Sequence, residues 1–125
     1  MKGEFDIKLI DFSNSCWTHH HFVKKITTRP YRAPEILLGM EYDSRVDLWS
    51  AACLMYRLLT GEHLFKPRKG KNYRKDDDHL AQIMEITGGF PLAYINASPK
   101  KKKFFHSNGQ LRKINTLKHL SLEWL

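Results

Sequence analysis

The chain has 125 residues, of which 42% are hydrophobic, so it is long enough for one modest domain and too apolar to be disordered throughout. No apolar run is long enough to span a bilayer, and the N-terminal stretch MKGEFDIKLI lacks the apolar centre of a signal peptide. The formal net charge of +8 arises mainly in residues 61–125, where thirteen Lys and Arg face six Asp and Glu. Such an excess attracts acidic or phosphate-rich partners without specifying which.

The first predicted element is a short half-buried strand, because Phe5, Ile7 and Leu9 alternate with charged residues. The turn-forming residues 13–15 end this strand. Residues 16–33 show no clean period, and we expect them to form a long extended loop.

The clearest helix is predicted over about residues 43–60. Asp43 and Ser44 open it, apolar residues recur at helical spacing, and Gly61 follows as a stop signal. Apolar residues occur on nearly all its sides, so we expect this helix to be buried in the middle of a domain. A shorter helical turn over residues 36–38 precedes it and ends at Gly39.

The second half of the chain combines basic loops with shorter helices. Residues 66–75, KPRKGKNYRK, are expected to form a polar basic loop. Three acids at 76–78 stand at the predicted start of a helix, where the helix dipole favours them, and glycines at 88 and 89 end that helix. Residues 90–115 are predicted to be irregular, and residues 116–125 to begin another amphipathic helix.

Three short motifs follow one another along the chain: DF at residues 11–12, APE at 33–35 and DLWS at 47–50. Each motif is weak alone. Their order and spacing resemble the D-F-G, A-P-E and D-x-W motifs in the second half of a protein kinase domain. The implied fold is mainly α, a partial kinase C-terminal lobe over residues 1–125 with a short N-terminal strand. The long activation-segment loop would span residues 11–35, and an insert would span about 92–115.

Longer stretches narrow the resemblance to the SR-protein kinases, which phosphorylate serines in Arg/Ser-rich splicing factors. These stretches are NSCWTHHHF, TTRPYRAPEILLG, CLMYRLLTGEHLFKP, DDDHLAQIMEITGGFP and KFFHSNGQLRKI. The resemblance implies a protein serine/threonine kinase that uses ATP and Mg²⁺ and acts in the regulation of RNA splicing. We expect protein substrates, with Arg/Ser-rich splicing factors as the implied class, and neither a membrane nor a nucleic-acid partner.

Two cysteines, Cys16 and Cys53, form no CxxC pair, which is typical of reduced thiols in the cytoplasm or nucleus. The kinase resemblance agrees with that location. We therefore expect a protein of the cytoplasm and nucleus.

The resemblance also implies roles for individual residues. Asp11 would hold Mg²⁺ beside the phosphates of ATP, although a simple turn aspartate is the alternative. The substrate would be bound by Thr28, Arg29 and Glu62. The scaffold would be held by Arg32, Glu35 and Asp47. For Asp47, the alternative is an exposed charge in the first turn of a helix.

The sequence departs from the kinase pattern in three ways. It contains no Gly-rich phosphate loop, no β3 lysine and no HRD catalytic loop, so none of its residues is a predicted catalytic residue. Ser13 replaces the glycine of D-F-G, which weakens the metal-site prediction. Four cations at residues 66–71 follow Glu62 and would repel an Arg/Ser peptide, unless the loop is merely solvated.

These departures leave alternatives open. We expect the 125 residues to be a fragment of a kinase that is inactive alone. The second hypothesis is a catalytically inactive, pseudokinase-like protein-binding module in which Asp11 is vestigial. A third hypothesis, a nucleic-acid binder that uses residues 66–75 and 100–113, depends on charge alone.

Overall fold

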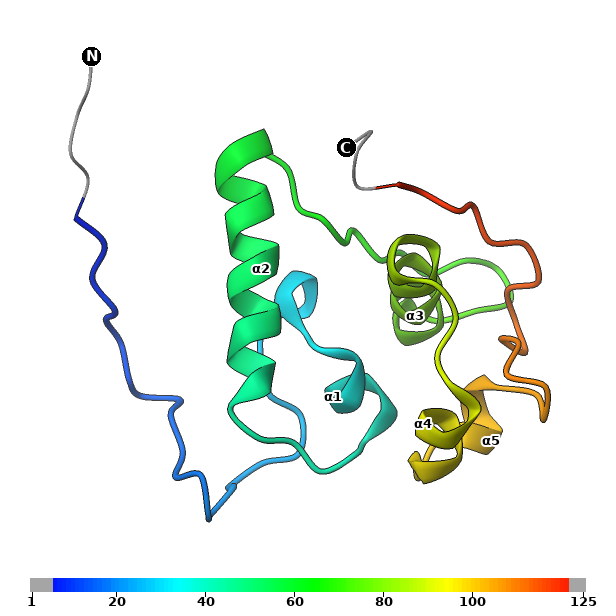
Figure 1. Cartoon of the computed structure of the whole chain (residues 1–125), viewed down its shortest axis with the longest axis horizontal. Coiled ribbons are helices and arrows are strands. Elements are labelled where there is room, and N and C mark those ends of the chain that lie inside the picture. Colours follow the sequence, from blue (N-terminus) through cyan, green and yellow to red (C-terminus); the bar gives the residue numbers. More distant parts are fainter. Residues whose placement is uncertain (1–5, 122–125) are drawn as a thin grey trace.

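A computed structural model describes residues 6–121, and this part of the chain is mainly helical, as predicted. Its elements are a 3-10 turn, η1 (Arg29–Tyr31), and the helices α1 (Pro34–Leu38), α2 (Arg45–Thr60), α3 (Lys75–Thr87), α4 (Leu92–Ala97) and α5 (Lys101–Phe104). In Figure 1, α2 stands on one side, the α3, α4 and α5 helices gather on the other, and α1 lies between them. None of the described helices is both long and apolar enough to cross a membrane.

The predicted N-terminal strand is not formed. Residues 6–12 have no regular secondary structure, and Ile7, Leu9 and Ile10 are each at least 80% exposed. Phe5, which also entered the prediction, lies outside the described residues. A strand needs a neighbouring strand to satisfy its backbone hydrogen bonds. In Figure 1 this segment runs by itself along the outer side of α2, which explains why the alternating pattern forms no ladder.

The short helical turn predicted before Gly39 is present as α1. Proline, which lacks an N–H donor, occupies the first position of this helix, where no N–H is needed for an intrahelical bond. Gly39 ends the helix with a left-handed φ of 69°. Ile36, Leu37 and Leu38 are buried. This one turn therefore contributes a compact apolar anchor directly after the long loop.

Helix α2 begins and ends close to the predicted residues. The Asp43 carboxylate accepts the Arg45 N–H at 2.9 Å, and Gly61 ends the helix with φ 77°. Its burial, however, is one-sided. Val46 and Cys53 are buried on the inner face, whereas four outer residues are 62–84% exposed: Leu48, Met55, Leu58 and Leu59. The prediction that this helix is buried on nearly all sides is wrong here, because the described residues supply packing partners for one face only.

The main hydrophobic core forms around α3. Leu80 and Ile83 of α3 are fully buried, as are Phe65 from the preceding loop and Phe104 from α5. The ring of Phe65 stacks on Trp49 of α2, with ring centroids 5.8 Å apart. This stack is one of the contacts that join the α2 side of the molecule to the α3 side, and Cys53 of α2 belongs to the same core cluster.

The last third of the chain differs from the prediction in two places. Residues 90–115 include two short helices, α4 and α5, where irregular structure was expected. The helix predicted from residue 116 is absent over 116–121, and residues 122–125 lie outside the described part. Instead, the N–H groups of Lys118 and Leu120 donate to the side chain and the carbonyl of Glu85, each at 2.9 Å. Those bonds replace the intrahelical bonds that a helix would need.

Candidate functional site

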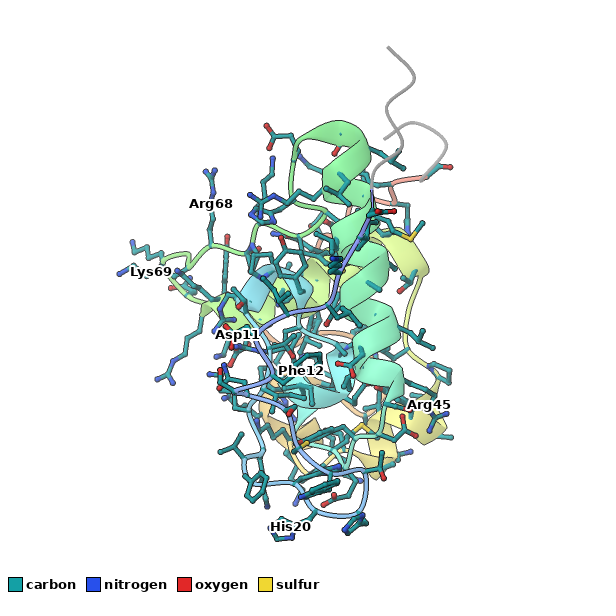
Figure 2. All side chains as sticks on the ribbon, turned by 90° about the vertical axis from the view of Figure 1, so that its left-hand side faces the viewer. Asp11, Phe12, His20, Arg45, Arg68 and Lys69 are labelled. Carbon is teal, nitrogen blue, oxygen red and sulfur yellow. The ribbon has the colours of Figure 1, made fainter. Side chains whose placement is uncertain are left out.

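Asp11 occupies an exposed turn on the N-terminal segment (Figure 2). Its backbone has φ 62°, a left-handed conformation that aspartate tolerates better than most residues. Its carboxylate Oδ1 accepts a hydrogen bond from the Ser13 hydroxyl at 2.6 Å. That bond, followed by a weaker one from the Ser13 N–H, lowers the pKa of Asp11. Ser13 itself has no positive φ. Position 13 therefore does not require glycine, and its hydroxyl orients the predicted metal ligand.

The fit of Asp11 to Mg²⁺ can be judged from its surroundings. Mg²⁺ in nucleotide sites is typically held by one or two carboxylates together with substrate phosphates and waters. Asp11 offers one exposed, ionised carboxylate, which fits that role. Within residues 6–121, no three metal-ligating His, Cys, Asp or Glu side chains gather in one place. Asp11 thus fits as a single ligand to a nucleotide-bound metal, and it is not part of an all-protein metal centre.

The next predicted site residues lie where η1 meets α3. Thr28 precedes η1 and is exposed, and its carbonyl accepts the Tyr31 N–H at 3.0 Å. The Arg29 guanidinium donates to Asp76 at 2.6 Å. Burial raises the pKa of Asp76, but the hydrogen bond and charge of Arg29, together with the charges of Lys25 and Lys103, outweigh this effect, so the pKa lies below its ordinary value. Arg29 is therefore fixed to α3 by an ionised partner.

Arg32 fixes the same segment from inside. It is buried, and its guanidinium donates to the carbonyls of Ile26 at 3.1 Å and Thr27 at 2.7 Å. Thr27 has the strained φ of 69°, which these contacts hold in place. The Ser50 hydroxyl of α2 donates to the Tyr31 carbonyl at 2.9 Å. The end of the long loop is thus tied to both α2 and α3.

The remaining predicted residues are dispersed. Glu35 is half-buried and lines a hollow of about 440 Å³ together with Tyr94. Asp47 is exposed in the first turn of α2. It borders a hollow of about 330 Å³ between residues 14–27 of the long loop and the start of α2. Glu62 follows the far end of α2, where it is exposed and ion-paired with Lys66. The structure thus brings Thr28, Arg29 and Arg32 together but does not gather the whole predicted set into one site.

Two residues at this site were missed by the sequence prediction. Asp76 was interpreted only as a helix-start acid, yet it is the partner of Arg29. His79 is fully buried, its ring lies 5.4 Å from the Phe65 ring, and burial lowers its pKa to about 4. Residues three apart on a helix share a face, so the DDDH pattern held the signal that Asp76 and His79 point the same way.

Known proteins resemble the chain over nearly all its length. The protein kinase domain family matches residues 1–119. SRSF protein kinase 3 from Homo sapiens is 45% identical over 116 residues, which is 93% of this chain and 20% of that protein. The serine/threonine-protein kinase SRPK from Physarum polycephalum is 44% identical over 111 residues, which is 89% of this chain and 26% of that protein. SKY1, a serine/threonine-protein kinase from Saccharomyces cerevisiae, is 45% identical over 117 residues, which is 94% of this chain and 16% of that protein. The chain thus spans about a quarter or less of the length of these relatives.

Proposed function

The chain belongs to the protein kinase family, and from that premise we propose that it provides the activation segment and the helices of a C-terminal lobe in a protein serine/threonine kinase of the SR-protein kinase type. The observation that carries the proposal is the anchored end of the long loop. Arg29 is paired with α3, Arg32 holds the strained Thr27, and Tyr31 is bonded to α2. A loop that receives a protein substrate needs such fixed geometry, because catalysis depends on positioning.

In this proposal the chain's own residues prepare two contacts. Asp11, kept ionised and oriented by Ser13, is the ligand for the Mg²⁺ that accompanies ATP. When bound, that metal offsets the charge of the phosphoryl group in transfer. Thr28 and Arg29 shape the surface beside the accepting serine or threonine, while Glu35 and Asp47 support the scaffold. The base that takes the hydroxyl proton is not among these 125 residues, so we propose that they do not transfer phosphate unaided.

The substrate class needs a separate argument. Arg/Ser-rich splicing factors are the substrates we propose, in keeping with the resemblance to SR-protein kinases. Glu62 is the acid that would meet an arginine, but Lys66 pairs with it, and that hydrogen bond and charge lower the pKa of Glu62. An arginine-rich peptide must displace Lys66, so we expect weaker docking at this position than an unpaired acid would give.

Location follows from the same proposal. Cys16 and Cys53 are both free thiols in the structure. Free thiols suit a reducing compartment. We propose that the protein acts in the cytoplasm and nucleus, where its splicing-factor substrates would be found.

The proposal can be tested with a chimera in which the matched residues of this chain replace their counterparts in SRSF protein kinase 3. We expect the chimera to transfer the γ-phosphate of ATP to an Arg/Ser peptide, and the 125-residue chain alone to transfer none. A chimera that folds but phosphorylates neither the Arg/Ser peptide nor a general Ser/Thr substrate would contradict the proposal.

A pseudokinase-like binding module remains the second candidate, and one observation is compatible with it as well as with a kinase fragment. The outer face of α2 carries several exposed large apolar residues, among them Leu58 and Leu59. A face of this kind normally packs against another polypeptide. The two candidates differ in their use of nucleotide. A binding module would still hold a partner protein in the chimera when ATP and Mg²⁺ are absent, whereas phosphoryl transfer requires both.

A further inference from the structure

A tight hairpin follows α5 and carries an exposed serine at its tip. Phe105 pairs with Leu111 across the hairpin, and the His106 N–H donates to the Gln110 carbonyl at 2.8 Å. Phe105 and Leu111 are buried, so the tip between them is fixed on the fold. Ser107 is exposed at this tip, and within the described residues its hydroxyl makes no hydrogen bond. This hydroxyl is therefore free to be modified without loss of a structural contact.

The tip borders a hollow of about 300 Å³ that, in the part of the chain that the structure describes, no carboxylate lines. Three cations share this lining with Ser107: Lys101, Lys102 and Arg112. Among residues 6–121, none of the three forms an ion pair. The Arg112 Nε donates to the Phe105 carbonyl at 2.8 Å, which fixes its guanidinium beside the hollow. A negative charge placed at the tip would therefore meet unpaired positive charge.

Two other exposed serines have different surroundings. The Ser13 hydroxyl already donates to the Asp11 carboxylate at 2.6 Å, so a phosphate on it would lie beside a negative charge. Ser44 lines a hollow together with Asp43 and Asp47. Phosphate at either position would be repelled by neighbouring carboxylates, whereas phosphate at the hairpin tip would be attracted.

We propose that Ser107 is a phosphorylation site, modified by a separate serine/threonine kinase that selects basic sequences, and that its phosphate is then bound by Lys101, Lys102 and Arg112. The Ser107 Oγ forms a bond to the γ-phosphorus of ATP. The bond from that phosphorus to the β-phosphate oxygen breaks and releases ADP, and the hydroxyl proton passes to the modifying kinase. The lysines at 100–103 precede the acceptor and supply a charge pattern by which a kinase can select its substrate.

The phosphate would act as a local clamp. A phosphoserine carries a charge of about −1.5 to −2 at pH 7 and three strong acceptor oxygens, enough to bond several cations at once. Lys101 and Lys102 belong to α5, which lies beside α4 in Figure 1, and Arg112 follows the hairpin. Modified Ser107 would thus connect the hairpin tip to α5. The inference does not depend on phosphoryl transfer by the chain itself.

The acceptor is tested by incubating the full 125-residue chain with basic-directed serine/threonine kinases and Mg²⁺-ATP, with peptide mass spectrometry to locate the phosphate. We expect the phosphate mainly on Ser107, and S107A to lose most of the incorporation. S44A, which removes an equally exposed serine, should incorporate as much as the parent. Phosphate that is absent from Ser107, or found chiefly on other serines, would overturn the assignment of the acceptor.

The clamp is tested on the chain with phosphoserine installed at position 107 by chemical ligation, so this result does not depend on any kinase. Phosphorus NMR follows the second pKa of the phosphate, which is about 6 in an unstructured peptide. We expect this pKa to be lower in the folded chain than in the urea-unfolded chain by roughly 0.5 or more, because the cations favour the doubly charged form. His106 also lines the hollow and titrates nearby, so H106N is measured to separate its contribution.

The variant K101A/K102A removes two cations of the hollow and leaves the Arg112 hydrogen bond in place. In this variant at least half of the pKa shift should disappear. The matched control K8A/K24A removes the same charge from exposed residues outside the hollow and should keep the parent shift. Circular dichroism checks that the helices remain, and K102A alone serves if the double variant unfolds. Equal pKa values in the folded and unfolded chains, or an equal loss of the shift in the control, would overturn the clamp.

Discussion

Arg29 and Asp76 form an ion pair at 2.6 Å between two residues that are 47 positions apart in the chain. Their side chains are 26% and 25% exposed, so water screens the pair less than it screens an exposed one. The η1 turn has no buried residue of its own. This pair therefore ties η1 directly to α3, in addition to the Ser50 hydrogen bond that ties η1 to α2.

The effects of removing Arg29 and of removing Asp76 on the free energy of unfolding should not be additive. In a double-mutant cycle of R29A and D76N, we expect a coupling free energy of about 1 kcal/mol or more, measured by urea unfolding of the 125-residue chain. The exposed pair Arg45–Asp43 is the matched control, with side chains 82% and 52% exposed. Its coupling should be close to zero. Equal coupling in the two cycles would show that the Arg29 contact is no more than a surface ion pair.

The outer face of α2 gives a second prediction. Leu58 and Leu59 are 69% and 84% exposed, so the double change L58K/L59K should leave the helix content of the 125-residue chain intact and reduce its self-association. The same change in the kinase chimera should destabilise the fold, because the rest of the domain would cover this face. Analytical ultracentrifugation and circular dichroism measure the two effects.

A buried position on α3 provides the contrast. Leu80 is fully buried, so L80K should unfold the chain with or without the rest of a kinase. If L58K/L59K unfolds the isolated chain as L80K does, the outer face of α2 is not free in solution.

The buried imidazole of His79 predicts how stability depends on pH. Burial, aided by the charges of Arg29 and Arg32 and opposed by Asp76, lowers the pKa of His79 from 6.5 to about 4. The unfolded chain therefore binds more protons between these values. The free energy of unfolding should therefore be unaffected by His79 above pH 6.5. It should decrease as the pH falls toward 4, by at most about 3 kcal/mol.

Urea unfolding across this pH range measures the effect. In H79L the slope between pH 6.5 and 4 should flatten, whereas H106N, at an exposed loop position, should keep the parent slope. A parent-like slope in H79L would assign the acid sensitivity to other groups.

The hydroxyl of Ser13 should control the ionisation of Asp11. Because that hydroxyl donates to Asp11 at 2.6 Å, S13A should raise the pKa of Asp11 toward its ordinary value of 3.8. Carbon-detected NMR of the carboxylate follows this pKa directly. S15A is the matched control, since the Ser15 hydroxyl donates to the Phe12 carbonyl instead. An unchanged pKa in S13A would show that the turn does not orient this acid.

The helices that were predicted correctly owe their accuracy to local signals. Helices α1, α2 and α3 all end at glycines with positive φ, and α2 and α3 are long enough to show a periodic apolar pattern. Helices α4 and α5 have six and four residues, too few for a period to appear. The N-terminal strand and the last helix were wrong because their outcome depends on distant partners. In the described part of the chain, residues 6–121, no strand lies beside Ile7, and the Lys118 N–H donates to Glu85 instead of to a carbonyl of its own turn.

The same distinction applies to the candidate site. Arg29 and Arg32 were found through one continuous motif, TRPYRAPE. Asp76 was not identified as the partner of Arg29, because no local pattern indicates a contact across 47 residues. The one-sided burial of α2 also could not be predicted from the local sequence. Apolar residues on all sides of a helix do not tell which polypeptide segment covers each side.

The most direct test of the account is the Mg²⁺ dependence of phosphoryl transfer in the kinase chimera. We expect D11N to lower transfer to an Arg/Ser peptide by about 100-fold or more at fixed Mg²⁺, because a metal contact contributes several kcal/mol to the stabilisation of the transition state. The exposed change D43N should leave transfer almost unaltered. Transfer by D11N at the parent rate, with the parent Mg²⁺ dependence, would contradict the account.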